Sequence, residues 1–304
     1  MSIFRKTFLM LSENNWLHEF IMSHGFSKSM ASRFTAGETL KEAVLAVQEL
    51  NRKGMFATLD HLGENVSTKE EALRSSEIYF QILDDIQKNG VNSNVSLKMT
   101  ELGLDLDPEL ARDNLEKILK RAAERNNFIR IDMEGSNYTE KTLTLFQQVY
   151  QVYKNVGVVI QAYLYRSEKD IENLIKMQAR VRLCKGAYSE PPDTAFPKKT
   201  DVDQNYLKLM KMLLLNGNYP GFATHDPQII EAIQRTAQEH KVPLDRFEFQ
   251  MLYGIRRDLQ DELVKQGYNL RIYVPFGTHW YPYFMRRLAE RPANLFFFLK
   301  NLTR

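Results

Sequence analysis

Eight short apolar segments alternate with amphipathic helical patterns from residue 55 onward, and this alternation constrains the fold more than any other feature of the chain. Eight strand and helix pairs in about 250 residues are typical of a (β/α)8 barrel, whereas a doubly wound sheet with so many strands would be unusual. We therefore predict an α/β fold, a TIM-type barrel. The predicted strands are Met55 to Asp60, Ser93 to Met99, Phe128 to Met133, Val158 to Leu164, Arg180 to Lys185, Gly221 to His225, Phe247 to Leu252 and Leu270 to Val274.

Capping residues mark where the intervening helices begin and end. The predicted starts are Thr39 with Glu42, Ser67 with Glu70, Asp107 with Pro108, Ser167 with Asp170, and Asp226 with Pro227. The predicted stops are Gly54, Gly90, Gly157, Gly217 and Gly267.

Residues 1–54 precede the alternation and have helical patterns of their own. We expect them to form an N-terminal helical arm, followed by a catalytic barrel of residues 55–304. No low-complexity linker separates the two segments, so one structural domain is expected overall.

Composition excludes several classes of function. Forty-one basic and 38 acidic residues leave a formal charge of +3, which is too even to suggest nucleic-acid binding. Cys184 is the single cysteine and the six histidines are scattered, so neither a disulfide framework nor a metal site is predicted. The apolar run near the N-terminus is too short for a signal peptide, and LFFFL near the C-terminus is too short to span a bilayer. A cytoplasmic protein is expected.

Polar residues occur at the carboxyl ends of six predicted strands. In a barrel these ends surround one cavity, so their side chains are predicted to share a site. Any one of them alone would also fit a solvated strand end or a helix cap, but their agreement in register favours an active site. They are Lys98, then Arg130, Asp132 and Glu134, then Gln161 and Tyr163, Arg182 and Lys185, Thr224 and His225, and Tyr273.

Two of these strand ends have features that suit an anion. Gly186 lets the backbone approach a ligand closely, and Lys185 adds the positive charge that a pyrophosphate needs. Thr224 and His225 lead into a helix whose amino end also favours an anion. Each signal is weak by itself.

The last predicted strand ends at Pro275, and a helical pattern begins near Trp280. On that helix Tyr283 and Glu290 each lie three or four residues from both Arg286 and Arg287, so these four residues can share one side of the helix. The two adjacent guanidinium groups suit a carboxylate ligand. The same set of polar residues would also fit a solvated face of a surface helix.

No GxGxxG follows a strand, and GxxxxGKS, GxSxG and metal-ligand spacings are all absent from the sequence. Rossmann dinucleotide binding, P-loop chemistry, hydrolase triads and zinc chemistry are therefore disfavoured.

In chain order, a series of motifs from about Leu59 to Leu299 closely resembles the proline dehydrogenase family. The motifs are LGEN, SLKM, IDME, QAYL, VRLCKGAYSEP, ATHDP, QMLYG, RIYVPFG and YPYFMRRLAERP. The resemblance implies a distorted barrel that binds FAD without a Rossmann fold. It also implies oxidation of L-proline to 1-pyrroline-5-carboxylate, the first step of proline catabolism to glutamate, by hydride transfer from proline C5 to flavin N5.

The resemblance also assigns roles to individual residues. Asp132 and Arg182 would be the catalytic pair of charges, with Arg182 near flavin N5, and Tyr273 would join them as a wall of the proline ring. Tyr283 would form the other wall. Lys98, Arg286 and Arg287 would hold the substrate carboxylate beside Glu290, and Glu64 would pair with Arg286 as a gate. The FAD contacts would be Met133, Gln161, Lys185, Gly186, Ala187, Tyr188, Thr224 and His225.

Partners follow from the same resemblance. The chain lacks the aldehyde dehydrogenase and DNA-binding modules of bifunctional relatives, so a separate pyrroline-5-carboxylate dehydrogenase is expected downstream. A quinone-type electron acceptor is implied, and with it a peripheral position at the inner face of a membrane. Cys184 stands where the family pattern suggests an aliphatic residue, and core packing is its expected role.

Other functions stay open at this point. One is another flavin barrel resembling methylenetetrahydrofolate reductase, against which the paired arginines argue because they suit a small carboxylate. A second is a Schiff-base aldolase that uses Lys98 or Lys185. A barrel without catalysis, which serves only for binding or membrane docking, is the third.

Overall fold

A computed structural model describes residues 34–63, 66–283 and 285 of the chain. Eight parallel strands pair in chain order, and the last pairs with the first to close a barrel. The predicted TIM-type fold is confirmed. The strands are β1 Phe56–His61, β2 Ser93–Leu97, β3 Ile129–Ile131, β4 Val156–Gln161, β5 Arg180–Cys184, β6 Gly221–Ala223, β7 Glu248–Leu252 and β8 Leu270–Phe276.

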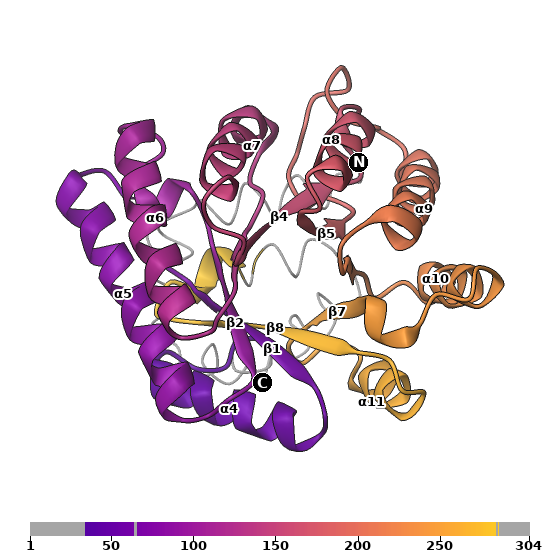
Figure 1. The fold of residues 1–304 in the computed structure, drawn as a ribbon, viewed down its shortest axis with the longest axis horizontal. Helices are drawn as coiled ribbons and strands as arrows, with labels where there is room; N and C mark the ends of the chain where they lie inside the picture. Colours follow the sequence, from indigo (N-terminus) through magenta and orange to yellow (C-terminus); the bar gives the residue numbers. More distant parts are fainter. Residues whose placement is uncertain (1–33, 64–65, 284, 286–304) are drawn as a thin grey trace, which may run out of the picture.

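Helices surround the strands on all sides, as Figure 1 shows. Their inward faces and the outward faces of the strands form one continuous apolar core. The helices are α4 Leu40–Arg52, α5 Lys69–Lys88, α6 Pro108–Glu124, α7 Ser136–Tyr150, α8 Ser167–Lys176, α9 Lys199–Asn216, α10 Pro227–Glu239 and α11 Arg257–Lys265. Two short 3₁₀ turns, Thr100–Leu102 and Leu244–Arg246, complete the described elements.

Helix α4 belongs to this outer ring although it precedes the first strand. Ala43, Val44 and Val47 are buried on its inner face, and the helix packs against β1 and β8. In Figure 1 it lies outside these two strands, between α5 and α11. The part of the expected arm that the structure describes therefore belongs to the barrel wall. The division of the chain at residue 54 stays a prediction.

Helices begin at all five predicted starts to within one or two residues, and the predicted cap is present in three of them. Thr39 with Glu42 forms a complete capping box, and Asp107 and Asp226 cap α6 and α10 with their side chains. The box of α5 lies one residue later than predicted, because Thr68 pairs with Glu71, and Ser67 only adds donors to the same carboxylate.

Helix α8 begins at Ser167, and its cap position is occupied by Arg166 without a side-chain cap. The Ser167 hydroxyl instead donates to the carbonyl of Gln161.

Gly157 does not end a helix, as was predicted, but lies within β4. A side chain at this position would place its Cβ 2.4 Å from the carbonyl oxygen of Arg180 on the neighbouring strand. The glycine therefore serves close strand packing rather than helix termination.

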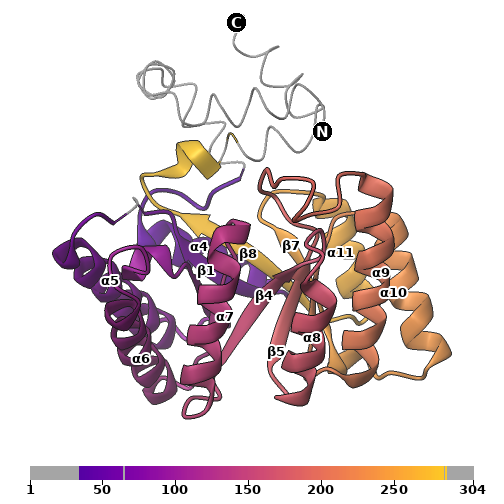
Figure 2. The same ribbon diagram turned by 90° about the horizontal axis from the view of Figure 1, so that it is seen from above.

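Several strands end earlier than predicted, and this leaves polar residues just beyond the sheet. Lys98 follows β2, Asp132 and Met133 follow β3, and Thr224 and His225 follow β6. The last strand instead continues through Pro275, which lies opposite Asp60 in the pairing with β1. Figure 2 shows the short yellow helix that begins at Trp280 above this end of the barrel. Within the described ranges, no helix has both the length and the apolar character needed to cross a bilayer.

Candidate active site

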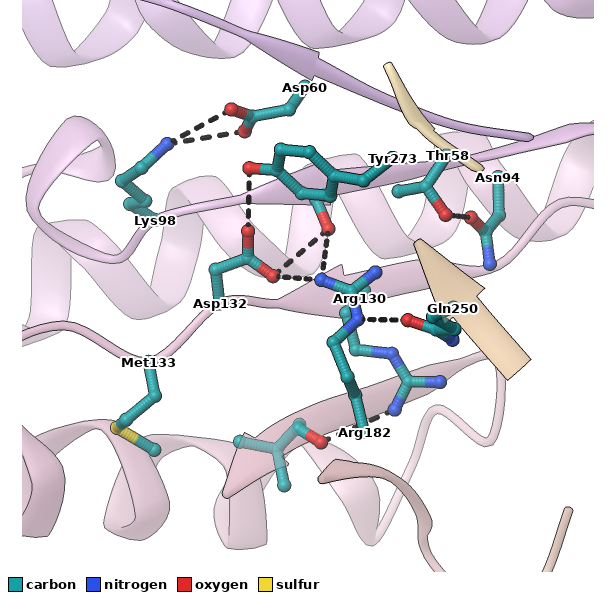
Figure 3. Close-up of polar contacts among 12 residues, drawn as sticks. Thr58, Asp60, Asn94, Lys98, Arg130, Asp132, Met133, Arg182, Gln250 and Tyr273 are labelled. Carbon is teal, nitrogen blue, oxygen red and sulfur yellow. Dashed lines mark hydrogen bonds and ion pairs between the residues drawn. The ribbon is translucent and has the colours of Figure 1, made fainter. Parts of the chain in front are cut away.

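Arg182 is the centre of a polar network at the carboxyl ends of the strands (Figure 3). Its side chain leaves β5 and is 8% exposed. Nη1 donates to Oδ1 of Asp132 at 2.7 Å and to the hydroxyl of Ser96 at 3.3 Å, and Nε donates to the side-chain oxygen of Gln250. Three partners fix the guanidinium in one orientation, so this buried cation is already ordered.

Asp132 joins this cation to the last strand. Its Oδ1 also accepts the hydroxyl of Ser96 at 3.0 Å, and its Oδ2 accepts the hydroxyl of Tyr273 at 3.0 Å. The Tyr273 ring lies 5.4 Å from the Arg182 guanidinium carbon. Burial, and then the charge of Asp132, raise the pKa of Tyr273 well above its ordinary value, so its hydroxyl stays a neutral donor. Side chains from β5 and β8 thus meet on one carboxylate.

A second ionic group surrounds Lys98. Its Nζ lies 3.2 Å from Oδ1 of Asp60 and 3.3 Å from Oε1 of Glu101. The other oxygen of Glu101, Oε2, accepts the hydroxyl of Tyr79. Burial lowers the pKa of Lys98, but the charges of Asp60 and Glu101 outweigh burial and hold that pKa well above its ordinary value. The ammonium group is therefore firmly protonated.

Asp60 at the end of β1 is fully buried. Burial raises its pKa to about 6, although the charge of Lys98 opposes this rise, while Asp132 and Glu101 add to it. With both acids ionised, the cluster of Lys98, Asp60 and Glu101 has a net charge of −1.

Lys185 pairs with two acids on the opposite side of the barrel mouth. Its Nζ lies 2.6 Å from Oδ1 of Asp203 in α9 and 2.9 Å from Oδ2 of Asp226, and Lys199 shares both carboxylates. An anion that binds Lys185 must therefore compete with these acids for the positive charge of the lysine.

The amino end of α10 already holds a carboxylate, because Asp226 accepts the amide of Gln228 at 3.2 Å. Thr224 accepts the amide of Asp226 at 3.1 Å. His225 accepts the amide of Leu252 on Nε2 at 3.0 Å, so a neutral ring has its proton on Nδ1. These contacts fix the turn after β6.

Gln161 is the last residue of β4, and of the two polar atoms of its side-chain amide only the nitrogen is hydrogen-bonded to described residues. Nε2 donates to the carbonyls of Met133 at 2.9 Å and Glu134 at 3.0 Å. Oε1 is buried and has no hydrogen-bond partner among the described residues. An unpartnered buried acceptor is costly, so this atom indicates a ligand donor.

Gly186 has a φ of +109°, and a Cβ at this position would lie 2.3 Å from the ring of Tyr163. The chain therefore needs this glycine for its own packing, whether or not a ligand approaches.

The family model for proline dehydrogenase matches residues 43–299. The chain belongs to the proline dehydrogenase family. It is 44% identical to Proline dehydrogenase 2 of Bacillus subtilis (strain 168) over 302 residues, which cover 99% of both chains. It is 37% identical to Proline dehydrogenase of Deinococcus radiodurans over 305 residues, which cover 99% of this chain and 98% of the relative. Family membership makes the protein an oxidoreductase.

A solved structure of proline utilization A from Bdellovibrio bacteriovorus, inactivated by N-propargylglycine, has a similar fold. The TM-score is 0.84 at 28% sequence identity, over 95% of this chain and 36% of that larger chain. The barrel thus matches about a third of a proline utilization protein.

Several predicted residues meet directly in the structure. Asp132, Arg182 and Tyr273 form one hydrogen-bonded group, and Lys98 forms an ionic cluster of its own. Arg130 lies opposite Ser96 in the pairing of β2 with β3 and so points to the same side of the sheet, as predicted. It does not join the Asp132 group, because its Nη1 donates to the carbonyl of Val158 at 3.3 Å and to that of Arg180, the first residue of β5, at 2.6 Å.

The roles of the other predicted residues stay predictions. Ala187 and Tyr188 are half-buried in the loop after β5, and Tyr283 is buried in the helix that begins at Trp280. The gate and clamp residues Glu64, Arg286, Arg287 and Glu290 lie outside the described residues.

Sequence reasoning missed four residues of this site: Asp60, Ser96, Glu101 and Gln250. Asp60 ends the first predicted strand much as Asp132 lies near the end of the third, so the strand-end rule would have found it. Gln250 lies in the middle of β7, and only the three-dimensional contact with Arg182 reveals its role.

Proposed function

We propose that this protein oxidises L-proline to 1-pyrroline-5-carboxylate with bound FAD, by hydride transfer from proline C5 to flavin N5. The observation that carries this proposal is the buried pair of Arg182 and Asp132, held by Tyr273, Ser96 and Gln250, in a chain of the proline dehydrogenase family.

The residues at the mouth fit a flavin. The unpartnered Oε1 of Gln161 suits an N–H donor of a heterocyclic ring, and Arg182 offers a fixed cation beside it. Met133, Thr224 and His225 would add contacts from the ends of β3 and β6, and the loop of Lys185, Gly186, Ala187 and Tyr188 would line the cofactor. When bound, FAD supplies the two-electron acceptor that the chain's own side chains lack.

Arg182 would stabilise negative charge that develops at the acceptor during oxidation. A cation that is already held by Asp132 and Gln250 needs no reorganisation at that moment, which is the condition under which fixed charges lower a barrier most. Tyr273 would present its ring to the substrate while its hydroxyl keeps Asp132 oriented.

The substrate carboxylate would bind Arg286 and Arg287, with Glu290 beside them and Lys98 as a third cation. Lys98 must then share its charge between this carboxylate and its partners Asp60 and Glu101. Tyr283 would form the second wall of the proline ring, and Glu64 would close the site by pairing with Arg286.

Electrons would pass from the reduced cofactor to a quinone-type acceptor, and a separate pyrroline-5-carboxylate dehydrogenase would use the product. We place the protein in the cytoplasm, with a peripheral contact at the inner face of the membrane where such an acceptor is found.

Schiff-base chemistry is disfavoured on a specific observation. A lysine nucleophile must be neutral, but Lys98 and Lys185 each lie between two carboxylates, and the pKa of Lys98 is held well above its ordinary value. A reductase that uses folate has no comparable support among the described contacts.

The visible spectrum of the purified protein tests the proposal. We expect oxidised flavin bands that bleach when L-proline is added without oxygen. A protein that is colourless and cannot be reconstituted with FAD would overturn the proposal, as would a flavin that proline leaves oxidised.

A further inference from the structure

Glu190 lies in the long loop between β5 and α9, yet its carboxylate binds the start of another helix. Its Oε1 accepts the backbone amide of Ser136 at 2.8 Å, and its Oε2 accepts the hydroxyl of the same residue. Ser136 is the first residue of α7, which follows β3. The contact therefore joins two loops at the mouth of the barrel.

Helix α7 lacks a capping side chain of its own. Gly135 occupies the cap position and makes no side-chain hydrogen bond there. A carboxylate at the amino end of a helix satisfies a free amide and the positive end of the helix dipole. Helices usually obtain this cap from an adjacent residue, whereas here it comes from a residue 54 positions later in the chain.

Tyr163 connects the same carboxylate to the loop that follows β5. Its hydroxyl donates to Oε1 of Glu190 at 3.1 Å. Its ring packs against Gly186, where a Cβ would lie 2.3 Å away, and its amide donates to the carbonyl of Lys185 at 2.9 Å. The carbonyl of Tyr163 also accepts the amide of Phe196 at 2.8 Å, near the far end of the loop.

We propose that Glu190 is a positioning residue for the cofactor loop, which we define as residues 185–188. By holding the Tyr163 hydroxyl at the start of α7, Glu190 fixes the surface against which Lys185 and Gly186 pack, so that the loop is ordered before FAD binds. This inference rests on the proposed function, because residues 185–188 are proposed there to line FAD. A purely structural role would stabilise α7 and leave cofactor binding unchanged.

The test measures the rate at which FAD leaves the purified holoenzyme, together with hydrogen–deuterium exchange of residues 185–190. In Glu190→Ala we expect FAD to leave about tenfold faster, and the loop amides to exchange faster, because three hydrogen bonds to the carboxylate are lost. Glu190→Gln keeps one acceptor oxygen and should show a smaller change. Tyr163→Phe should accelerate FAD release a few-fold, and less than additively with Glu190→Ala, because both changes break the same bond.

A second variant separates capping from positioning. Gly135→Asp, made in the Glu190→Ala background, supplies α7 with a local cap, and the nearest atom to the new Cβ is the exposed amide oxygen of Asn137. We expect this double variant to regain thermal stability while FAD still leaves as fast as from Glu190→Ala.

Three results would overturn the inference. FAD release that is unchanged in Glu190→Ala, despite a lower melting temperature, would show a structural role alone. Recovery of FAD retention by Gly135→Asp would show that only the helix cap matters. A wild-type protein that binds no FAD would refute the proposed function as well, whereas the first two results leave it standing.

Discussion

The hydroxyl of Tyr273 donates to Oδ2 of Asp132 at 3.0 Å, while Arg182 binds the other oxygen of the same carboxylate at 2.7 Å. The carboxylate is thus held between a neutral donor and a cation, and its rotation is blocked from both sides. This arrangement makes the orientation of the Arg182 guanidinium dependent on a residue of β8.

Tyr273→Phe should lower the free energy of unfolding by about 1 kcal/mol, because one buried hydrogen bond is lost and the ring stays. Turnover of proline should fall several-fold with unchanged FAD content, since Asp132 is less constrained. Tyr206→Phe is a matched control: its hydroxyl donates to the carbonyl of Leu183 at 3.3 Å, away from the Asp132 network. Urea denaturation and steady-state kinetics check both variants. Equal kinetics in the two would remove Tyr273 from the catalytic group.

Arg182→Lys keeps the charge but loses the fork that reaches Asp132 and Gln250 together. We expect a loss of about 3 kcal/mol in stability, because buried partners are left without donors. Arg52→Lys changes an exposed pair with Glu49 and should cost less than about 1 kcal/mol. Thermal denaturation of both variants decides the comparison. Similar costs would mean that the Arg182 contacts are weak.

Arg286→Met and Arg287→Met should each reduce kcat/KM for proline by the equivalent of about 2 to 4 kcal/mol, because a charge-assisted contact to the substrate carboxylate is removed. FAD content should change little. Arg235→Met on the exposed side of α10 is the control, and its kinetics should match the wild type. Wild-type kcat/KM in both test variants would place the carboxylate elsewhere.

Asp60 should make stability depend on pH in an unusual direction. Its folded-state pKa is raised from an ordinary 3.8 to about 6, so between these values the folded protein binds more protons than the unfolded chain. Through this group, stability therefore falls as pH rises from about 4 to about 6. The stability of wild type relative to Asp60→Asn should decrease across that window, as measured by urea denaturation. Lys98, Glu101, Asp132 and Tyr273 face Asp60 in both proteins, and parallel curves would contradict the raised pKa.

The barrel could be predicted from the sequence because each strand and helix has its own local pattern. Capping pairs such as Asp107 with Pro108 depend on neighbours in the chain, and the structure confirms them. The shift from Ser67 to Thr68 shows the limit of such signals, since adjacent hydroxyl residues both fit the pattern and geometry selects one.

Asp132, Arg182 and Tyr273 meet at the barrel mouth because strand ends converge, but the further partners of the strand-end residues could not be predicted. Asp203 reaches Lys185 from α9, and Gln250 reaches Arg182 from β7, across 68 residues of chain. Such contacts depend on side-chain directions at several strand ends at once. A pattern in one segment contains no information about them.

The place of α4 in the ring has a consequence for synthesis on the ribosome. Helix α4 and β1 emerge before the rest of the barrel, but β8, the strand against which both pack, emerges more than 200 residues later. Until then the outer edge of β1 has no strand partner, and an unpaired edge invites contacts between nascent chains. Closure of the barrel therefore joins the two ends of the described chain in one late step, and conditions that slow elongation lengthen the time for which this edge is open.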